Sequence, residues 1–213
     1  MIITDIKKEK KHLCRVCFDC GREELLDTDI VLENCLHKED LINDQKLEEL
    51  IAASDYHRAK QRALWYLDSK AFTERELYRK LIEKGFKKEA VAKVIARFVE
   101  LGLLDDRRFA ENYLERLYSK NTSKREAYYK MMNKGFPKEI IDELINSSSV
   151  DERQQIREII EKKYRLKLET KENVEKVYAA LIRKGFSFSA VRDELKAYSE
   201  ELSLQSEEIS EEF

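Results

Sequence analysis

Three closely spaced cysteines, Cys14, Cys17 and Cys20, are the residues of this sequence that could most readily do chemistry, and His12 and His37 lie nearby. Thiolate and imidazole groups at short spacing are typical zinc ligands, and paired thiols can act in redox reactions. The surrounding residues alternate between apolar and polar, which predicts a strand. On a strand the first and third thiols lie roughly 20 Å apart, at ~3.3 Å per residue. One metal ion cannot reach both, so we expect unbonded cysteines; zinc remains an alternative if the segment is a loop.

The fourth cysteine, Cys35, lies in the same N-terminal part of the chain, and free thiols in a reducing compartment are the simplest interpretation. No run approaches the roughly 20 apolar residues that span a bilayer. The first thirty residues also lack the apolar core of a secretory signal. We therefore expect a cytoplasmic protein with no membrane segment.

Other catalytic patterns are missing from the sequence. It contains three histidines in no nucleophile or base arrangement, no Gly-rich phosphate loop and no His-Glu-x-x-His pattern. The pair Asp105-Asp106 precedes a predicted helix at Arg107, where carboxylates cap the helix and interact with its dipole. We expect a protein that is not an enzyme, with no catalytic residue, no metal and no cofactor.

The tripeptide Lys-Gly-Phe recurs with a fixed period, and this repeat indicates the architecture. Its copies are Lys84-Gly85-Phe86, Lys134-Gly135-Phe136 and Lys184-Gly185-Phe186. Eleven residues before each lysine stand Thr73, Ser123 and Asn173, whose side chains can cap a helix N-terminus. From each cap a helix is predicted to run to the lysine and to end at the glycine, after which the phenylalanine folds back onto the bundle.

A second amphipathic helix follows each phenylalanine, and another precedes each cap, so that every unit is predicted to be a three-helix bundle. The helices before the caps are predicted at Tyr56 to Ser69, Arg107 to Lys120 and Asp151 to Arg165. The expected fold is mainly all-α, with three tandem three-helix bundle repeats in an elongated, curved arrangement and a small N-terminal β-hairpin-containing segment. The predicted boundaries are 1–53 for the hairpin and short helices, 54–104, 105–149 and 150–198 for the repeats, and 199–213 for the tail.

The two ends of the chain differ from the repeats. Residues 12–18 and 23–26 are predicted to pair as a hairpin across the turn at Asp19-Cys20-Gly21. Thr28-Asp29 can cap a short helix through Leu36, and Asn43-Asp44 can cap a second one that ends at Ala53. The C-terminal residues are acidic and rich in serine with no apolar face, so we expect them to be disordered.

Charge is distributed unevenly along the chain, although its formal net charge is only −2. Residues 1–53 carry a net charge of −5, residues 54–198 carry +9 and residues 199–213 carry −6. A basic body favours an acidic or polyanionic partner, while ordinary solvated helix faces would explain the same composition.

Several aromatic residues lie among arginines and lysines, a composition that single-strand nucleic-acid binders use for base stacking. The residues are Trp65, Tyr66, Tyr78, Tyr128 and Tyr129. Their helical spacing favours the interior of the bundles instead, so we expect core packing and not base stacking.

Motifs in the repeats resemble the signature of the RecX family. The matching residues are Arg62-Ala63-Leu64, Leu67, Thr73-Glu74-Arg75-Glu76-Leu77, Leu81, Lys84-Gly85-Phe86, Leu101-Gly102-Leu103-Leu104-Asp105-Asp106 and Phe109-Ala110. The resemblance covers roughly residues 55 to 200, and the N-terminal segment is similar to that of longer, Gram-positive-type members. The cysteine-rich hairpin and the Glu-rich tail depart from the family pattern.

The resemblance implies a monomeric regulatory protein that binds the RecA nucleoprotein filament along its groove. It implies modulation, with inhibition as the expected sign, of recombinase, ATPase and coprotease activities in recombination, DNA repair and the SOS response. The alternative is a protein whose basic repeats bind the phosphate backbone of single- or double-stranded DNA directly. The expected partner contacts are Arg58, Arg62, Arg75, Arg79, Lys80, Arg107, Arg108, Arg116, Lys124, Arg125 and Lys130.

Overall fold

The computed structural model describes residues 1–9, 12–165, 168 and 171–211. The chain divides into two compact units, Met1–Asp105 and Asp106–Phe213. The described residues are mostly helical, as predicted, with one small sheet at the N-terminus. None of the helices in these residues is long and apolar enough to cross a membrane.

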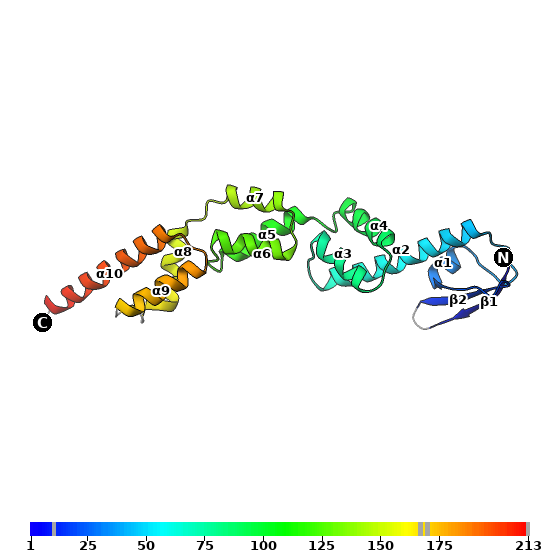
Figure 1. Ribbon diagram of the computed structural model, residues 1–213, viewed down its shortest axis with the longest axis horizontal. Helices are drawn as coiled ribbons and strands as arrows, with labels where there is room; N and C mark the ends of the chain where they lie inside the picture. Colours follow the sequence, from blue (N-terminus) through cyan, green and yellow to red (C-terminus); the bar gives the residue numbers. More distant parts are fainter. Residues whose placement is uncertain (10–11, 166–167, 169–170, 212–213) are drawn as a thin grey trace. The chain divides into compact units, whose positions relative to one another are not determined.

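The N-terminal sheet has three antiparallel strands in the order β1-β2-β3: β1 Ile3–Lys8, β2 Leu13–Phe18 and β3 Glu23–Asp27. The β2–β3 hairpin is as predicted, with Cys14 paired to Leu26 in its register. The prediction missed β1 (Figure 1), whose register with β2 shifts after Ile3. Only Ile3 of β1 is fully buried, so this strand lacks the apolar alternation that marks β2.

The predicted break between the N-terminal segment and the first repeat does not exist as a helix boundary. After the short α1, Thr28–Glu33, a single helix α2 runs from Asp44 to Ser69, through the predicted boundary at residues 53 and 54. Asn43 caps α2 as predicted, because its side chain accepts the Lys46 N–H at 2.7 Å. The first turns of α2 pack on the sheet and its later turns pack in the first repeat, so one helix belongs to two cores.

Each repeat has its own hydrophobic core. In the first unit, α2 is joined by α3, Glu74–Glu83, and α4, Lys88–Glu100 (Figure 1). In the second unit, α5 Asp106–Tyr118, α6 Lys124–Lys134 and α7 Lys138–Ser147 surround a separate core that contains Met131 and Phe136. The predicted caps Thr73 and Ser123 both accept a backbone N–H three residues on, at 3.1 and 3.2 Å.

The three Lys-Gly-Phe motifs end their helices with the same pair of hydrogen bonds. In the first repeat, Gly85 N–H donates to Ile82 at 2.9 Å and Phe86 N–H donates to Leu81 at 3.3 Å. The same two bonds recur at Gly135 and Phe136 and at Gly185 and Phe186. All three glycines have a positive φ, between 85° and 96°. This Schellman geometry turns each phenylalanine back toward the core, as the sequence predicted.

The third repeat is built from α8 Glu152–Ile159, the π-helix η1 Ile160–Tyr164, α9 Lys171–Arg183 and α10 Phe188–Glu211. Two predictions about it are wrong. Asn173 lies inside α9 instead of capping it, because the helix begins two residues earlier. The predicted disordered tail continues α10 as far as Glu211, because Glu, Leu and Gln favour helix and no Gly or Pro interrupts them. Residues 212 and 213 lie outside the described part.

The second and third repeats are joined at the third Lys-Gly-Phe motif. The Ser123 hydroxyl, which caps α6, also donates to the carbonyl of Lys184 at 2.6 Å. A Cβ added to Gly185 would lie 2.9 Å from this hydroxyl and 3.1 Å from Arg125 Cβ, closer than ordinary contact. Gly85 meets nothing within 4 Å in the same test. Glycine is therefore required at position 185 for two reasons: the φ is positive, and the neighbouring repeat leaves little space for a side chain.

We predict that Gly185→Ala destabilises the protein more than the matched substitution Gly85→Ala. Both place a side chain at positive φ, at a cost of about 1–2 kcal/mol. Only Gly185→Ala adds a steric clash, worth roughly 1–3 kcal/mol in a tightly packed position. Urea unfolding followed by circular dichroism would measure both variants. Equal losses of stability would show that the contact with Ser123 and Arg125 is not a constraint.

Candidate functional site

The basic residues predicted to contact a partner fall in both units, and all of them are exposed except Arg58 and Lys80, which are partly buried. Those of the first unit are Arg58, Arg62, Arg75, Arg79 and Lys80. Those of the second unit are Arg107, Arg108, Arg116, Lys124, Arg125 and Lys130. Since the two units are separate bodies, each group forms its own surface.

Three cations of the second repeat are already engaged within the protein. Arg107 donates to both carboxylate oxygens of Glu143, at 2.9 and 2.7 Å, and this hydrogen bonding lowers the pKa of Glu143. Lys130 pairs with Glu126 at 2.7 Å, one turn away. Lys124 donates to the carbonyl of Ser148 at 3.0 Å. Such exposed pairs contribute little to stability, but they reduce the charge offered to a partner.

Other residues predicted to contact a partner lie over an aromatic ring or near a carboxylate of the protein. Lys80 Nζ lies 5.6 Å from the centroid of the Tyr66 ring, and Arg116 Cζ lies 5.8 Å from that of Tyr113. Arg79 is 3.6 Å from Glu83. In the parts of the chain that the structure describes, no carboxylate lies within ion-pair distance of the three arginines Arg62, Arg75 and Arg125. These three offer their charge most fully.

A groove on the first unit brings two of the predicted arginines together with aromatic rings. Arg62 Cζ lies 5.4 Å from the centroid of the Trp65 ring, and Arg58 Cζ lies 6.0 Å from that of Phe86. The groove has a volume of about 490 Å³, and His57 lines it as well. Cation–π contact holds a guanidinium flat on a ring and leaves the N–H edge available for an acceptor. We call this the arginine–aromatic groove, defined by Arg58, Arg62, Trp65 and Phe86.

The expectation that all the aromatic residues among these cations pack in the cores is wrong for two of them. Trp65 is 62% exposed and Tyr129 is 56% exposed. Tyr66 is buried, and Tyr78 and Tyr128 pack against their cores, as predicted. Neighbouring residues on a helix point about 100° apart. The burial of Tyr66 therefore does not bury Trp65, the residue before it.

Two of the cysteines, Cys14 and Cys17, lie on strand β2, as predicted. Cys14 points into the core, where its Sγ lies 3.6 Å from Thr28 Oγ1. Burial and the Glu23 carboxylate raise the pKa of the Cys17 thiol. A raised thiol pKa disfavours the nucleophilic and metal-binding form.

A different set of ligand-type side chains does converge. Among the described residues, Asp27, Asp29 and His57 bring one ligand atom each to within 4.8 Å of one another. Asp27 already accepts the Asp29 N–H at 3.0 Å as the cap of α1, and His57 Nδ1 lies 3.1 Å from the same carboxylate oxygen. This contact places the start of α1 beside α2.

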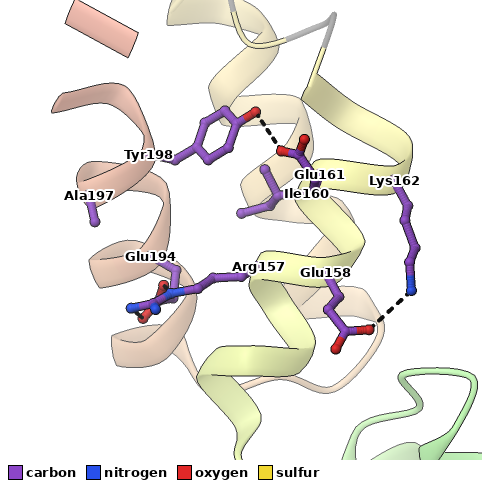
Figure 2. Close-up of a pocket in the computed structure, with 8 residues that line it drawn as sticks. All are labelled: Arg157, Glu158, Ile160, Glu161, Lys162, Glu194, Ala197 and Tyr198. Carbon is purple, nitrogen blue, oxygen red and sulfur yellow. Dashed lines mark hydrogen bonds and ion pairs between the residues drawn. The ribbon is translucent and has the colours of Figure 1, made fainter. Parts of the chain in front are cut away.

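A second pocket, of about 360 Å³, lies between α8, η1 and α10 in the third repeat. Figure 2 shows Arg157 reaching from α8 to Glu194 on α10, and Tyr198 donating to Glu161 at 3.2 Å. Lys162 pairs with Glu158 at 3.1 Å. The charged groups that line this pocket thus pair with one another and hold α10 on the repeat.

Glu194 and Glu143 each accept hydrogen bonds from one arginine, but the two carboxylates differ in burial. The Glu194 side chain is 3% exposed, whereas that of Glu143 is 56% exposed. We predict that Arg157→Ala costs roughly 1–3 kcal/mol, because it leaves a buried carboxylate without its main donor. Arg107→Ala should change stability much less, since water replaces its guanidinium.

Urea midpoints of the two variants would test this difference. Glu194→Gln in the Arg157→Ala background should recover part of the loss, because a neutral amide is cheaper to bury than a carboxylate. If Arg157→Ala and Arg107→Ala lowered the midpoint equally, burial of the carboxylate would not be the cause.

A local pattern in the sequence indicates one of these site pairs. Arg62 and Trp65 are three residues apart, a spacing at which helix side chains meet. Phe86 and Arg58 are far apart in sequence, as are Arg157 and Glu194, and only the folded structure brings each pair together.

The fold and these surfaces define a class: a protein of three-helix repeats whose exposed features are suited to binding a partner. The sequence profiles of two RecX domains match this chain, the first three-helix domain at residues 59–98 and the third at residues 151–195. The regulatory protein RecX of Clostridium perfringens strain SM101 is 30% identical over 193 residues, which cover 87% of this chain and 91% of that protein. That of Clostridium tetani is 30% identical over 200 residues, 91% and 92% of the two chains.

Solved structures of RecX proteins have a fold similar to that of this chain. A crystal structure of regulatory protein RecX has a TM-score of 0.64 at 20% identity and covers 90% of this chain and 98% of its own. That of RecX from Lactobacillus salivarius has a TM-score of 0.60 at 20% identity, with coverages of 69% and 98%. The chain belongs to the RecX family.

Proposed function

We propose that this protein is a regulator of RecA that binds RecA nucleoprotein filaments and inhibits their recombinase, ATPase and coprotease activities. Membership of a family of regulatory proteins is the observation that carries the proposal. The protein would act as a monomer in the cytoplasm, in recombination, DNA repair and the SOS response.

The surface chemistry of the repeats supports binding to an acidic protein. Arg62, Arg75 and Arg125 are exposed and have no carboxylate within ion-pair distance in the described residues. Positive potential of this kind speeds association with an acidic partner and fixes orientation. The separate cores of the repeats keep these side chains on rigid helices, which lowers the entropic cost of binding.

We further propose that the protein acts without catalysis. A catalytic acid or base needs a pKa suited to the reaction and a free position for the reacting atom. In the pocket of the third repeat the carboxylates are held by Arg157, Lys162 and Tyr198. The raised thiol pKa of Cys17 likewise argues against nucleophilic catalysis at this cysteine.

A second candidate function, direct binding to DNA phosphate, is favoured by Arg75 and Arg125, which are exposed and free of carboxylate partners in the described part of the chain. Phosphate binding needs little more than such exposed cations. It would give affinity for DNA without RecA that falls steeply between two salt concentrations.

We predict that the purified protein lowers RecA's DNA-dependent ATPase and strand exchange severalfold when it is in excess over RecA. Repeating both assays with excess DNA distinguishes the two functions. Inhibition through RecA should persist, whereas inhibition by occupying DNA should be relieved. Unchanged ATPase and strand exchange at saturating protein would refute RecA regulation.

A further inference from the structure

The arginine–aromatic groove has the features of a recognition site for one particular kind of segment. Arg58, Arg62 and Trp65 lie at spacings of four and three residues, so α2 presents them on one face. Phe86, from the first Lys-Gly-Phe motif, supplies the ring beneath Arg58. The motif that ends α3 therefore also shapes this groove.

Carboxylates neutralise the two guanidinium groups of the groove only in part. The carboxylate nearest to Arg58 is that of Asp55, at 3.9 Å, and this carboxylate is closer to Lys87, at 2.9 Å. Arg62 has no carboxylate within ion-pair distance in the described residues. Two neighbouring guanidiniums, of which one shares a distant carboxylate with a lysine and the other has none in the described residues, are suited to bidentate hydrogen bonding with a carboxylate or a phosphate.

An apolar surface continues from the same tryptophan. Trp65, 62% exposed, also lines a second hollow together with Leu64 and Leu103, both of which are exposed. Large apolar side chains beside an arginine are the usual centre of a protein–protein contact, where tryptophan and arginine contribute most of the binding energy. The groove and this hollow share Trp65 and Gln61, so one ligand can contact both.

We propose that this surface binds an acidic segment of a partner protein. A carboxylate of the segment lies against Arg58 and Arg62, and a large apolar side chain of the segment packs on Trp65 between Leu64 and Leu103. The inference rests on the proposed function in one respect, which is that the segment belongs to a RecA protomer.

The charges around the groove favour a protein segment over a nucleic acid. Asp27 and Asp29 line its other end, beside His57, and Asp68 lines the apolar hollow. A nucleic-acid strand carries a charge on every phosphate and needs a continuous line of cations. A peptide needs a carboxylate only where the arginines lie, and it can place neutral residues opposite the three aspartates.

Trp65 is the single tryptophan of the sequence and lies on the surface in question, so its fluorescence reports occupancy. The probes are two peptides of equal length in which acidic residues alternate with leucine and phenylalanine, one with Asp and Glu and one with Asn and Gln. The acidic peptide should shift the emission of Trp65 to the blue and saturate. Equal binding of the amide peptide, or saturation by oligothymidylate and not by the acidic peptide, would overturn the proposal.

Charge reversal gives a matched pair of variants. Arg62→Glu should weaken binding of the acidic peptide about tenfold, because it replaces a charge-assisted contact by repulsion. Lys93→Glu makes the same charge change on the exposed face of α4, outside the groove, and should alter affinity less than about twofold. Equal effects of the two variants would mean that net charge, and not the groove, attracts the peptide.

The apolar half of the surface is tested by Trp65→Ala with a fluorescein-labelled acidic peptide and anisotropy as the readout. Loss of a central tryptophan should weaken binding roughly 30-fold, and the loss should persist at high salt, where charge contacts are screened. The exposure of Trp65 makes unfolding of this variant improbable, and circular dichroism checks it. Unchanged affinity at both salt concentrations would exclude the apolar contact.

Binding to RecA filaments, measured by co-sedimentation, separates the groove from the proposed function. One outcome is that wild-type protein binds filaments, with Arg62→Glu binding about tenfold more weakly and Lys93→Glu binding as well as wild type. This result would support both RecA regulation and the groove as the RecA contact. If wild-type protein and Arg62→Glu bind filaments equally, the groove is not the RecA contact, but RecA regulation stands. If the acidic peptide binds and filaments do not, RecA regulation fails while the groove remains a peptide site.

Discussion

The left-handed glycine that ends a helix in each repeat is the constraint on which the rest of the structure depends. Because Gly85 adopts a φ of 85°, the chain reverses within two residues and Phe86 returns toward Leu81, to which its N–H donates. Each repeat can then close a core of its own. Full burial of a residue such as Leu81 stabilises by about 1.5–3 kcal/mol, more than helix propensity supplies at any one position. Packing within repeats leaves their outer faces free for recognition.

The same motif has different uses in different repeats. At Gly85 the space beyond the Cα atom is open, and the neighbouring Phe86 supports Arg58 at the groove. At Gly185 that space is filled by Ser123 and Arg125 of the preceding repeat. Since the Ser123 hydroxyl donates to the carbonyl of Lys184, the cap of one repeat fixes the helix end of the next. The same backbone geometry thus shapes the proposed groove in one unit and joins two repeats in the other.

Features that depend on local rules could be predicted from the sequence. Thr73 and Ser123 cap helices, and the three glycines end them, because these outcomes need only residues within one turn. Predictions failed where the structure is determined by packing between residues distant in the sequence, or where the local sequence pattern is weak. Strand β1 has a single fully buried residue, and α2 passes through the expected break at residue 53 because two cores hold it. The contact between Arg157 and Glu194 joins residues 37 positions apart, which no local pattern reveals.

Net charge is a poor guide to which cations can bind a partner. Residues 54–198 carry +9, yet Arg107, Lys124 and Lys130 already bond to groups of their own repeat. A partner would have to displace these bonds, and part of the binding energy would be lost. Arg62 differs, because its guanidinium lies 5.4 Å from the centroid of the Trp65 ring and no carboxylate of the described residues is within ion-pair distance. Contact with a ring does not neutralise the charge, and where it orders the side chain it lowers the entropy that binding would cost. In the proposed groove, recognition therefore depends on the few cations that lie over rings, more than on the total charge of the surface.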